Sequence, residues 1–159
     1  MSVAVFENVG LVAAVVALVV AQGLKPLTAR GAGGPWKPSL AFASGGFPSS
    51  HSAFVCALAT GVGAQWGLDS GSFACAVVIA CVVMYDATGV RRQAGFHATA
   101  INTLVAGTLF DEGFDAFVRR LQERPLREHI GHTPVQVVAG AVTGVVIGVV
   151  ISVSMIVVE

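Results

Sequence analysis

Four long apolar runs dominate the pattern of hydrophobic and polar positions along the chain. We predict membrane-spanning helices over about residues 5–24, 51–67, 70–86 and 134–157. A helix that crosses a bilayer needs about 20 predominantly apolar residues, with a range of about 17–25. The first and last runs meet this length outright. The two middle runs meet it if they pair as a hairpin across the short turn at residues 67–71.

The stretch between the third and fourth runs has a different pattern. Residues 98–110 form a short apolar run that includes Asn102 and several threonines, which suits a re-entrant or interfacial helix better than a crossing. Residues 111–127 mix both charges with apolar positions at helical spacing, which is typical of an amphipathic helix at a membrane surface. We therefore predict an interfacial or re-entrant segment over about residues 97–125.

Together these patterns predict the fold class. The chain is expected to be an all-α integral membrane helical bundle with a single transmembrane domain over residues 1–159. It would have four transmembrane helices, a short re-entrant or interfacial helix and an amphipathic segment. The Met1 end lacks the basic region and the cleavage site of a signal peptide, so we expect the first helix to be retained.

The composition agrees with a membrane protein. Hydrophobic residues make up 55% of the 159 residues and charged residues only 11%, against roughly 25% charged residues in soluble domains. Nine Lys and Arg residues balance nine Asp and Glu residues, which argues against a nucleic-acid partner. The three cysteines lie in apolar runs without zinc-site or disulfide spacing, so we predict no metal site.

The positions of the basic residues favour four crossings over five. With four crossings, all nine Lys and Arg residues fall on one face of the membrane, whereas five crossings would divide them between both faces. The positive-inside rule then predicts that the basic face is cytoplasmic, or the organellar equivalent. The sequence leaves open which membrane holds the protein.

Four polar segments converge on this basic face under the four-crossing topology. They are Lys25–Arg30, Gly45–Ser52, Tyr85–Gln93 and Arg127–Pro134. Arginine and lysine neutralise phosphoryl oxygens, and a helix N-terminus attracts an anion. One histidine could attack phosphorus while a second protonates the leaving oxygen. Taken singly, the segments could equally be helix caps, topology anchors or ion pairs, so their co-location carries the argument for a phosphate-ester site.

These segments resemble the divergent branch of the type-2 phosphatidic acid phosphatase superfamily, also described as acid phosphatase/vanadium-dependent haloperoxidase-related proteins. The resemblance rests on Gln22–Lys25, Gly45–Ala53, Tyr85–Gly95, Asn102 and Gly131–Gly144. It implies hydrolysis of lipid or isoprenoid phosphates and diphosphates through a phosphohistidine, without a metal or other cofactor.

The resemblance also implies roles for individual residues. His132 would be the nucleophile and His51 the acid for the leaving group. Phosphate oxygens would be bound by Lys25, Arg30, Ser49, Ser50, Arg91, Arg92 and Arg127, with Asp86, Glu128 and Asn102 in supporting positions. Gln136 stands where the parent superfamily has a carboxylate, four residues after the nucleophile, and supplies no charge. Asp86 or Glu128 would replace that carboxylate if either reaches His132.

Two classes of function remain open at this point. The first is a membrane-embedded phosphohydrolase. The second, which Gln136 favours, is a non-catalytic protein that binds anionic lipid or phosphate, or a structural subunit of a membrane complex. A vanadate-dependent oxidase and a transporter have less support, since nothing indicates halide chemistry and no charge lies deep in the last span.

The expected partners follow from the same features. They are membrane lipids and, for an enzyme, a lipid or isoprenoid phosphate substrate. A homo-oligomer or a larger membrane complex is also expected to be feasible, because Gly140, Gly144 and Gly148 form one small-residue stripe that allows close helix packing.

Overall fold

The computed structural model describes residues 5–107, 123–128 and 130–156. Its elements are η1 (Val5–Glu7), α1 (Val9–Gly31), η2 (Pro38–Phe42), α2 (Ser50–Trp66), α3 (Gly71–Thr88), α4 (Val90–Gly107) and α6 (Pro134–Ile156). This part of the chain contains no β-strand, which confirms the all-α class. Most of the predicted amphipathic segment at residues 111–127 lies outside the described residues.

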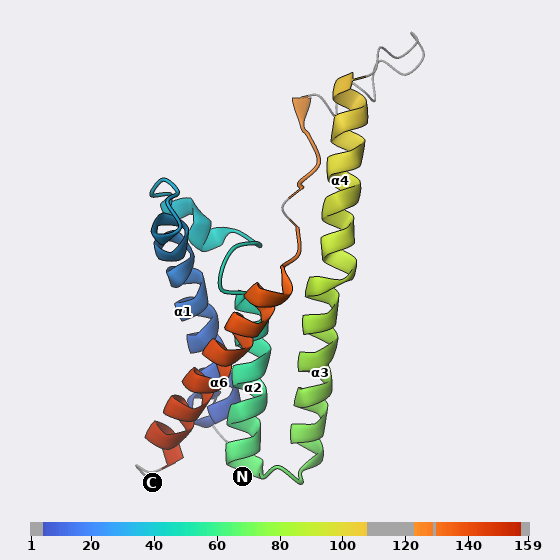
Figure 1. Ribbon diagram of the computed structural model, residues 1–159. Helices are drawn as coiled ribbons and strands as arrows, with labels where there is room; N and C mark the ends of the chain where they lie inside the picture. The colour runs from blue at the N-terminus through green and yellow to red at the C-terminus, as the bar shows by residue number, and fades with distance from the viewer. Residues whose placement is uncertain (1–4, 108–122, 129, 157–159) are drawn as a thin grey trace.

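The helices α1, α2 and α6 form the packed centre of the molecule, and α3 and α4 extend along one side (Figure 1). The helix α2 contacts α1, α3 and α6. The C-terminal ends of α1 and α3 lie at the same end of the bundle as the N-terminal ends of α2 and α6 (Figure 1). The topology therefore brings the four predicted polar segments to one end, while the turn between α2 and α3 lies at the other.

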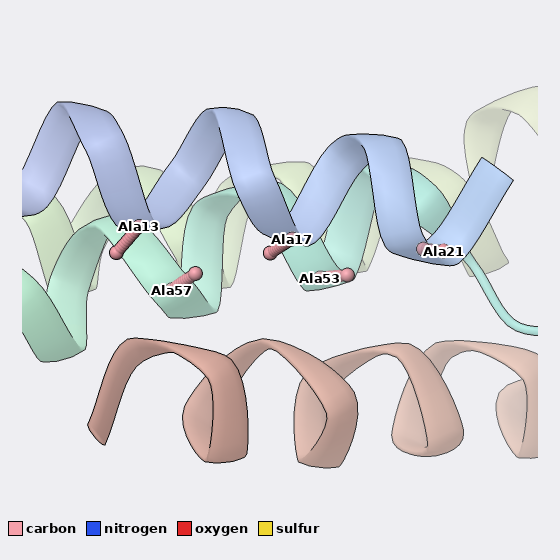
Figure 2. Packing of buried hydrophobic residues seen from close by; sticks show 5 residues of the cluster. All are labelled: Ala13, Ala17, Ala21, Ala53 and Ala57. Carbon is pink, nitrogen blue, oxygen red and sulfur yellow. The ribbon is translucent and has the colours of Figure 1, made fainter. Parts of the chain in front are cut away.

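Alanine dominates the centre of this bundle. The side chains that meet between α1 and α2 are fully buried (Figure 2), and they are Ala13, Ala17, Ala21, Ala53 and Ala57. Ile147 and Ile151 of α6 pack against them. Small side chains let helix backbones approach closely, so α1 and α2 pack tightly along these alanines.

The glycine stripe of α6 lies against α2 in the structure. A Cβ atom added to Gly140 would lie 2.2 Å from the carbonyl oxygen of Ser49, and one added to Gly144 would lie 2.3 Å from that of Ala53. Since real Cβ atoms do not approach backbone oxygens so closely, only glycine fits this interface. The stripe therefore serves packing within the chain.

We expect Gly144→Val to destabilise the fold by about 1–3 kcal/mol, because α6 must move away from α2 to make room for the side chain. Thermal unfolding of the detergent-solubilised protein would measure this loss. Gly23→Ala is the matched control, since a Cβ there meets nothing within 4 Å and alanine favours a helix. Equal melting temperatures for the two variants would contradict the packing described here.

Among the described residues, three stretches are long and apolar enough to cross a membrane: Val9–Gly31, Gly71–Val105 and Pro134–Ile156. The helix α2, at 17 residues, falls at the lower end of the spanning range. It coincides closely with the predicted second span, and the count of four transmembrane helices stays a prediction. Many apolar side chains of α3 and α6 point outward, as expected of surfaces that face lipid, among them Val78, Val82, Val142 and Val146.

Two helices differ in extent from the sequence predictions. The helix α1 continues past the predicted end at residue 24, through the buried Pro26 to Gly31. The Thr28 hydroxyl donates to the carbonyl of Phe47, 2.5 Å away, which ties this extra turn to the following loop. The first described part of the predicted interfacial or re-entrant segment, residues 97–107, is helical and belongs to α4, which continues the direction of α3 (Figure 1). Its location at an interface stays a prediction.

Candidate functional site

A cluster of buried polar side chains lies where α1, α2, α3 and α6 meet at one end of the bundle. Lys25, Ser49, Ser50, Ser52 and His132 are each at most 3% exposed. Polar groups removed from water cost free energy unless they find partners, so each of these side chains needs an explanation. Most are explained by contacts within the cluster, and the two histidines and the lysine are the groups with capacity left for a ligand.

Lys25 is held in the interior by the extension of α1 beyond its predicted end. Its ammonium group donates to the carbonyl of Ala43 at 2.7 Å and to the hydroxyl of Ser50 at 3.3 Å. Gly46, with φ of +96°, lies over the aliphatic part of the lysine. An ammonium group has three N–H donors, so these two bonds leave one donor without an acceptor in the described part of the chain. The site thus contains a positive charge that is incompletely satisfied.

The serines at the start of α2 have two different roles. Ser49 caps the helix, and Ser50 contacts Lys25. The hydroxyl of Ser49 accepts from the backbone N–H and from the hydroxyl of Ser52, at 3.3 and 3.0 Å, and so caps the helix. The backbone N–H of Ser49 donates to the carbonyl of Gln136 at 3.0 Å, which joins the start of α2 to the start of α6. Ser50 is the serine that contacts Lys25.

The two predicted catalytic histidines lie together. The ring centroids of His51 and His132 are 5.9 Å apart, in an edge-to-face arrangement with an interplanar angle of 61°. The charges of Arg91, Lys25 and Asp86 act electrostatically on His51. The Nε2 atom of His132 is buried and has no hydrogen-bond partner among the residues that the structure describes.

The backbone around His132 is fixed by α3 and α4. The backbone N–H of His132 donates to the carbonyl of Ala87 at 2.9 Å. Gly131 has φ of +89°, and a Cβ atom there would lie 2.5 Å from the backbone nitrogen of Arg92. Both the positive φ and the close approach require glycine at this position. His132 is therefore positioned by the end of α3 as well as by α6.

Gln136 fixes the ring of His132 through the cap of α6. Its Oε1 atom accepts from the backbone N–H of Thr133 at 3.0 Å, and the Thr133 hydroxyl accepts from the backbone N–H of Gln136 at 3.4 Å. This reciprocal pair is a capping box, and Pro134 begins the helix as capping statistics favour. The same Oε1 atom lies 3.1 Å from Nδ1 of His132.

The Thr133 contact determines which tautomer of His132 fits. A backbone N–H can only donate, so the Gln136 atom that it meets must be the oxygen rather than the amide nitrogen. That oxygen can only accept, so Nδ1 of His132 must bear the proton. In the neutral ring, Nε2 then carries a free lone pair, and this is the buried atom without a partner.

The surroundings of His132 favour this neutral ring. Burial is the main cause and lowers the pKa of His132 below its usual 6.5, the contact with Gln136 opposes the shift, and the charge of Lys25 adds to it. The backbone carbonyl groups of Gly46 and Ser44 also raise the pKa of His132, as Gln136 does. At neutral pH the net result is an uncharged imidazole.

We expect His132 to titrate with a midpoint below pH 6.5, which NMR of protein labelled at the histidine rings would measure. Since the unfolded chain binds the proton more readily, the His132 contribution to stability is fully present above pH 6.5. It is lost as the pH falls from there through the lowered pKa of the folded protein. A midpoint at or above pH 6.5 would contradict this burial.

The other predicted site residues are not part of the buried cluster. Arg91, predicted to bind phosphate, forms an ion pair with Asp86. Arg92 places its guanidinium 5.5 Å from the ring centroid of Phe96. Arg30 is exposed at the end of α1. It follows Lys25 by five residues, which places the two side chains about 140° apart around the helix.

Glu128 and Asn102 support the segment before α6. The side chain of Asn102 donates to Glu128 at 2.8 Å and to the carbonyl of Leu126 at 2.9 Å, and it accepts from the backbone N–H of Leu126 at 3.0 Å. Asp86 and Glu128 thus have partners other than His132. The contact with Nδ1 that the sequence suggested for a carboxylate is made instead by Gln136.

Sequence reasoning missed several residues that hold this site together. Thr133 is one of them, although the spacing Thr133 to Gln136 is that of a capping box and signals their pairing. Gly95 allows the segment before α6 to lie against α4, since a Cβ there would meet the carbonyl of Glu128 at 2.6 Å. The carbonyl groups of Ala43 and Ala87 carry no sequence signal, because every residue has one.

The long apolar helices define a membrane protein, and a buried polar cluster that includes a histidine lies at their ends. Comparison with known proteins agrees with this class. The chain belongs to the divergent PAP2 family, whose family model matches residues 6–147. It is 44% identical over 115 residues, 66% of this chain and 69% of the relative, to the uncharacterized membrane protein YuiD of Bacillus subtilis (strain 168). No solved structure gives a significant match to the chain.

Proposed function

We propose that the protein is a membrane-embedded, metal-independent phosphohydrolase that acts on lipid or isoprenoid phosphates or diphosphates. The observation that carries the proposal is the free lone pair on the buried Nε2 atom of His132, beside a second histidine and a buried lysine. Membership of the divergent PAP2 family supports a phosphatase-related role. A pocket at the end of a transmembrane bundle would meet its substrate at the headgroup of a lipid.

In the first step, Nε2 of His132 attacks the phosphorus atom and a P–N bond forms. The bond from phosphorus to the leaving oxygen breaks in line, and the electron pair goes to that oxygen. His51 donates a proton to the leaving oxygen. The ammonium group of Lys25 binds the phosphoryl oxygens as their negative charge develops, and Ser50 orients the lysine through its 3.3 Å contact.

In the second step, water attacks the phosphohistidine. His51, now neutral, accepts the proton of the attacking water, and the P–N bond breaks to return its electron pair to Nε2. Inorganic phosphate leaves, and both histidines return to their starting states. Gln136 keeps Nδ1 protonated through the cycle and accepts a hydrogen bond from the ring while it carries phosphate.

A second candidate function is a non-catalytic protein that binds anionic lipid or phosphate, or a structural subunit of a membrane complex. The neutral side chain of Gln136 favours it, because binding needs the cations but not a charged partner for the histidine. Under this reading Arg92→Ala would weaken association with anionic lipid vesicles, whereas His132→Ala would change association little.

The test is release of inorganic phosphate by the purified, detergent-solubilised protein. The substrates are matched lipid and isoprenoid mono- and diphosphates, and a chelator is present throughout. Release above that of a His132→Ala preparation would support the enzyme. Absence of release across the whole panel, combined with binding of anionic vesicles, would favour the second candidate.

A further inference from the structure

A cavity of about 620 Å³ lies next to the histidine pair, between the end of α1 and the segment that leads to α2. Neither His51 nor His132 lines it. Its size is typical of a site for a small ligand. The role proposed above uses the cluster around the histidines and leaves this cavity unassigned.

The cavity adjoins the histidine site through two shared parts. Lys25 lines the cavity and also contacts Ser50 at the start of α2. Ser44 and Gly46 line the cavity, and their carbonyl groups also act on His132. A ligand whose end group lies at His132 therefore has its next group at Lys25 and in the cavity.

The lining of the cavity is apolar apart from its cations. Leu40, Phe42 and Phe47 contribute large apolar side chains, and Lys25 and Arg127 contribute positive charge. No acidic residue is among the described residues that line it. Arg127 thus supplies a second positive charge on the cavity side of Lys25, away from the residues that hold the histidines.

The group that occupies the cavity depends on the substrate. In a phosphate monoester, the atom beyond the scissile phosphorus belongs to a neutral alcohol, which has no use for a cation. In a diphosphate, a second phosphate follows, and its negative charge matches Arg127, while Lys25 holds the scissile phosphate beside it. The apolar chain beyond that phosphate would then contact Leu40, Phe42 and Phe47.

We infer that the cavity is a subsite for the second phosphate and the first part of the chain of an apolar diphosphate ester, and that Arg127 selects for the diphosphate. This inference rests on the proposed function. His132 attacks the terminal phosphorus, the bond from that phosphorus to the bridging oxygen breaks, and His51 protonates the departing monophosphate ester. Water then releases inorganic phosphate from the histidine.

The first experiment compares farnesyl diphosphate with farnesyl monophosphate, in chelator, by phosphate release. We expect kcat/KM to be about tenfold higher for the diphosphate, and Arg127→Ala to remove most of that preference, since one charge-assisted contact is lost. Arg124→Ala is the charge-matched control, because Arg124 is exposed and does not line the cavity. Equal kcat/KM for the two esters, unchanged by Arg127→Ala, would overturn the inference and leave the phosphatase intact.

The second experiment separates the inference from the proposed function. Methylenediphosphonate and methylphosphonate are titrated into the solubilised protein, and binding is followed by calorimetry. Tighter binding of the diphosphonate, lost in Arg127→Ala and kept in Arg124→Ala, supports the subsite even if no ester is cleaved. Equal affinity for the two probes, or no binding of either, overturns it.

Discussion

Replacing His132 by alanine is expected to abolish phosphate release, with a loss of at least about 10³-fold in kcat. The variant removes the only lone pair in the described site that is buried, unpartnered and beside a second histidine. Its backbone contact with Ala87 does not involve the side chain, so the loop before α6 should keep its position. The loss would then reflect chemistry rather than folding.

The measurement combines turnover with capture of the covalent intermediate. Brief incubation with a substrate labelled at the scissile phosphate should leave label on the protein that is released by acid and stable to alkali, as expected of a phosphohistidine. His132→Ala should carry no label. His97→Ala, on the exposed surface of α4, should retain both label and turnover. Full labelling of His132→Ala would assign the nucleophile to another residue and overturn the mechanism.

The convergence of the polar segments at one end of the bundle could be predicted from the sequence, because it depends only on topology. Apolar runs of spanning length show where the helices lie, and the alternation of their directions brings the C-terminal ends of α1 and α3 and the N-terminal ends of α2 and α6 to one end of the bundle (Figure 1). This inference needs no side-chain geometry. The same reasoning predicted the turn between α2 and α3, which the structure contains at residues 67–70.

The grouping within the site could not be predicted, because it depends on contacts between distant residues. The apolar run stops at Leu24, so the predicted span ends there, yet α1 continues to Gly31 and places Lys25 inside and Arg30 outside. Glu128 looked like a replacement carboxylate for His132, but Asn102 holds it against α4. Both side chains are held by partners that are distant in the sequence. Ser50 is 25 residues from Lys25, and Asn102 is 26 residues from Glu128.

The role of Gln136 also depends on a contact that the sequence does not predict. The sequence indicates that a neutral residue stands where the parent superfamily has a carboxylate. In a serine protease, the comparable loss of charge costs about 10⁴ in kcat because the histidine adopts the wrong tautomer. Here the backbone N–H of Thr133 orients the glutamine oxygen toward the ring, so the correct tautomer is kept and only the charge is missing.

Gln136→Leu is therefore expected to lower kcat by about 10²–10⁴, because Nδ1 loses the acceptor that holds its proton. It should also cost about 1 kcal/mol of stability through the lost cap. Thr133→Val is the matched control. It removes the hydroxyl that caps α6 but keeps the backbone N–H that orients Gln136, so it should lose similar stability and keep most of its turnover.

Gln136→Glu distinguishes a positioning role from a structural one. Glutamate keeps the capping box and adds the missing charge, so it should raise the pKa of His132 and move the acid limb of the pH–rate profile to higher pH. Turnover above pH 7 should equal or exceed that of the unmodified protein, because the carboxylate stabilises the positive ring that forms in the first step. An unchanged pH profile in Gln136→Glu, or full turnover in Gln136→Leu, would show that Gln136 only caps α6 and that His132 reacts without its help.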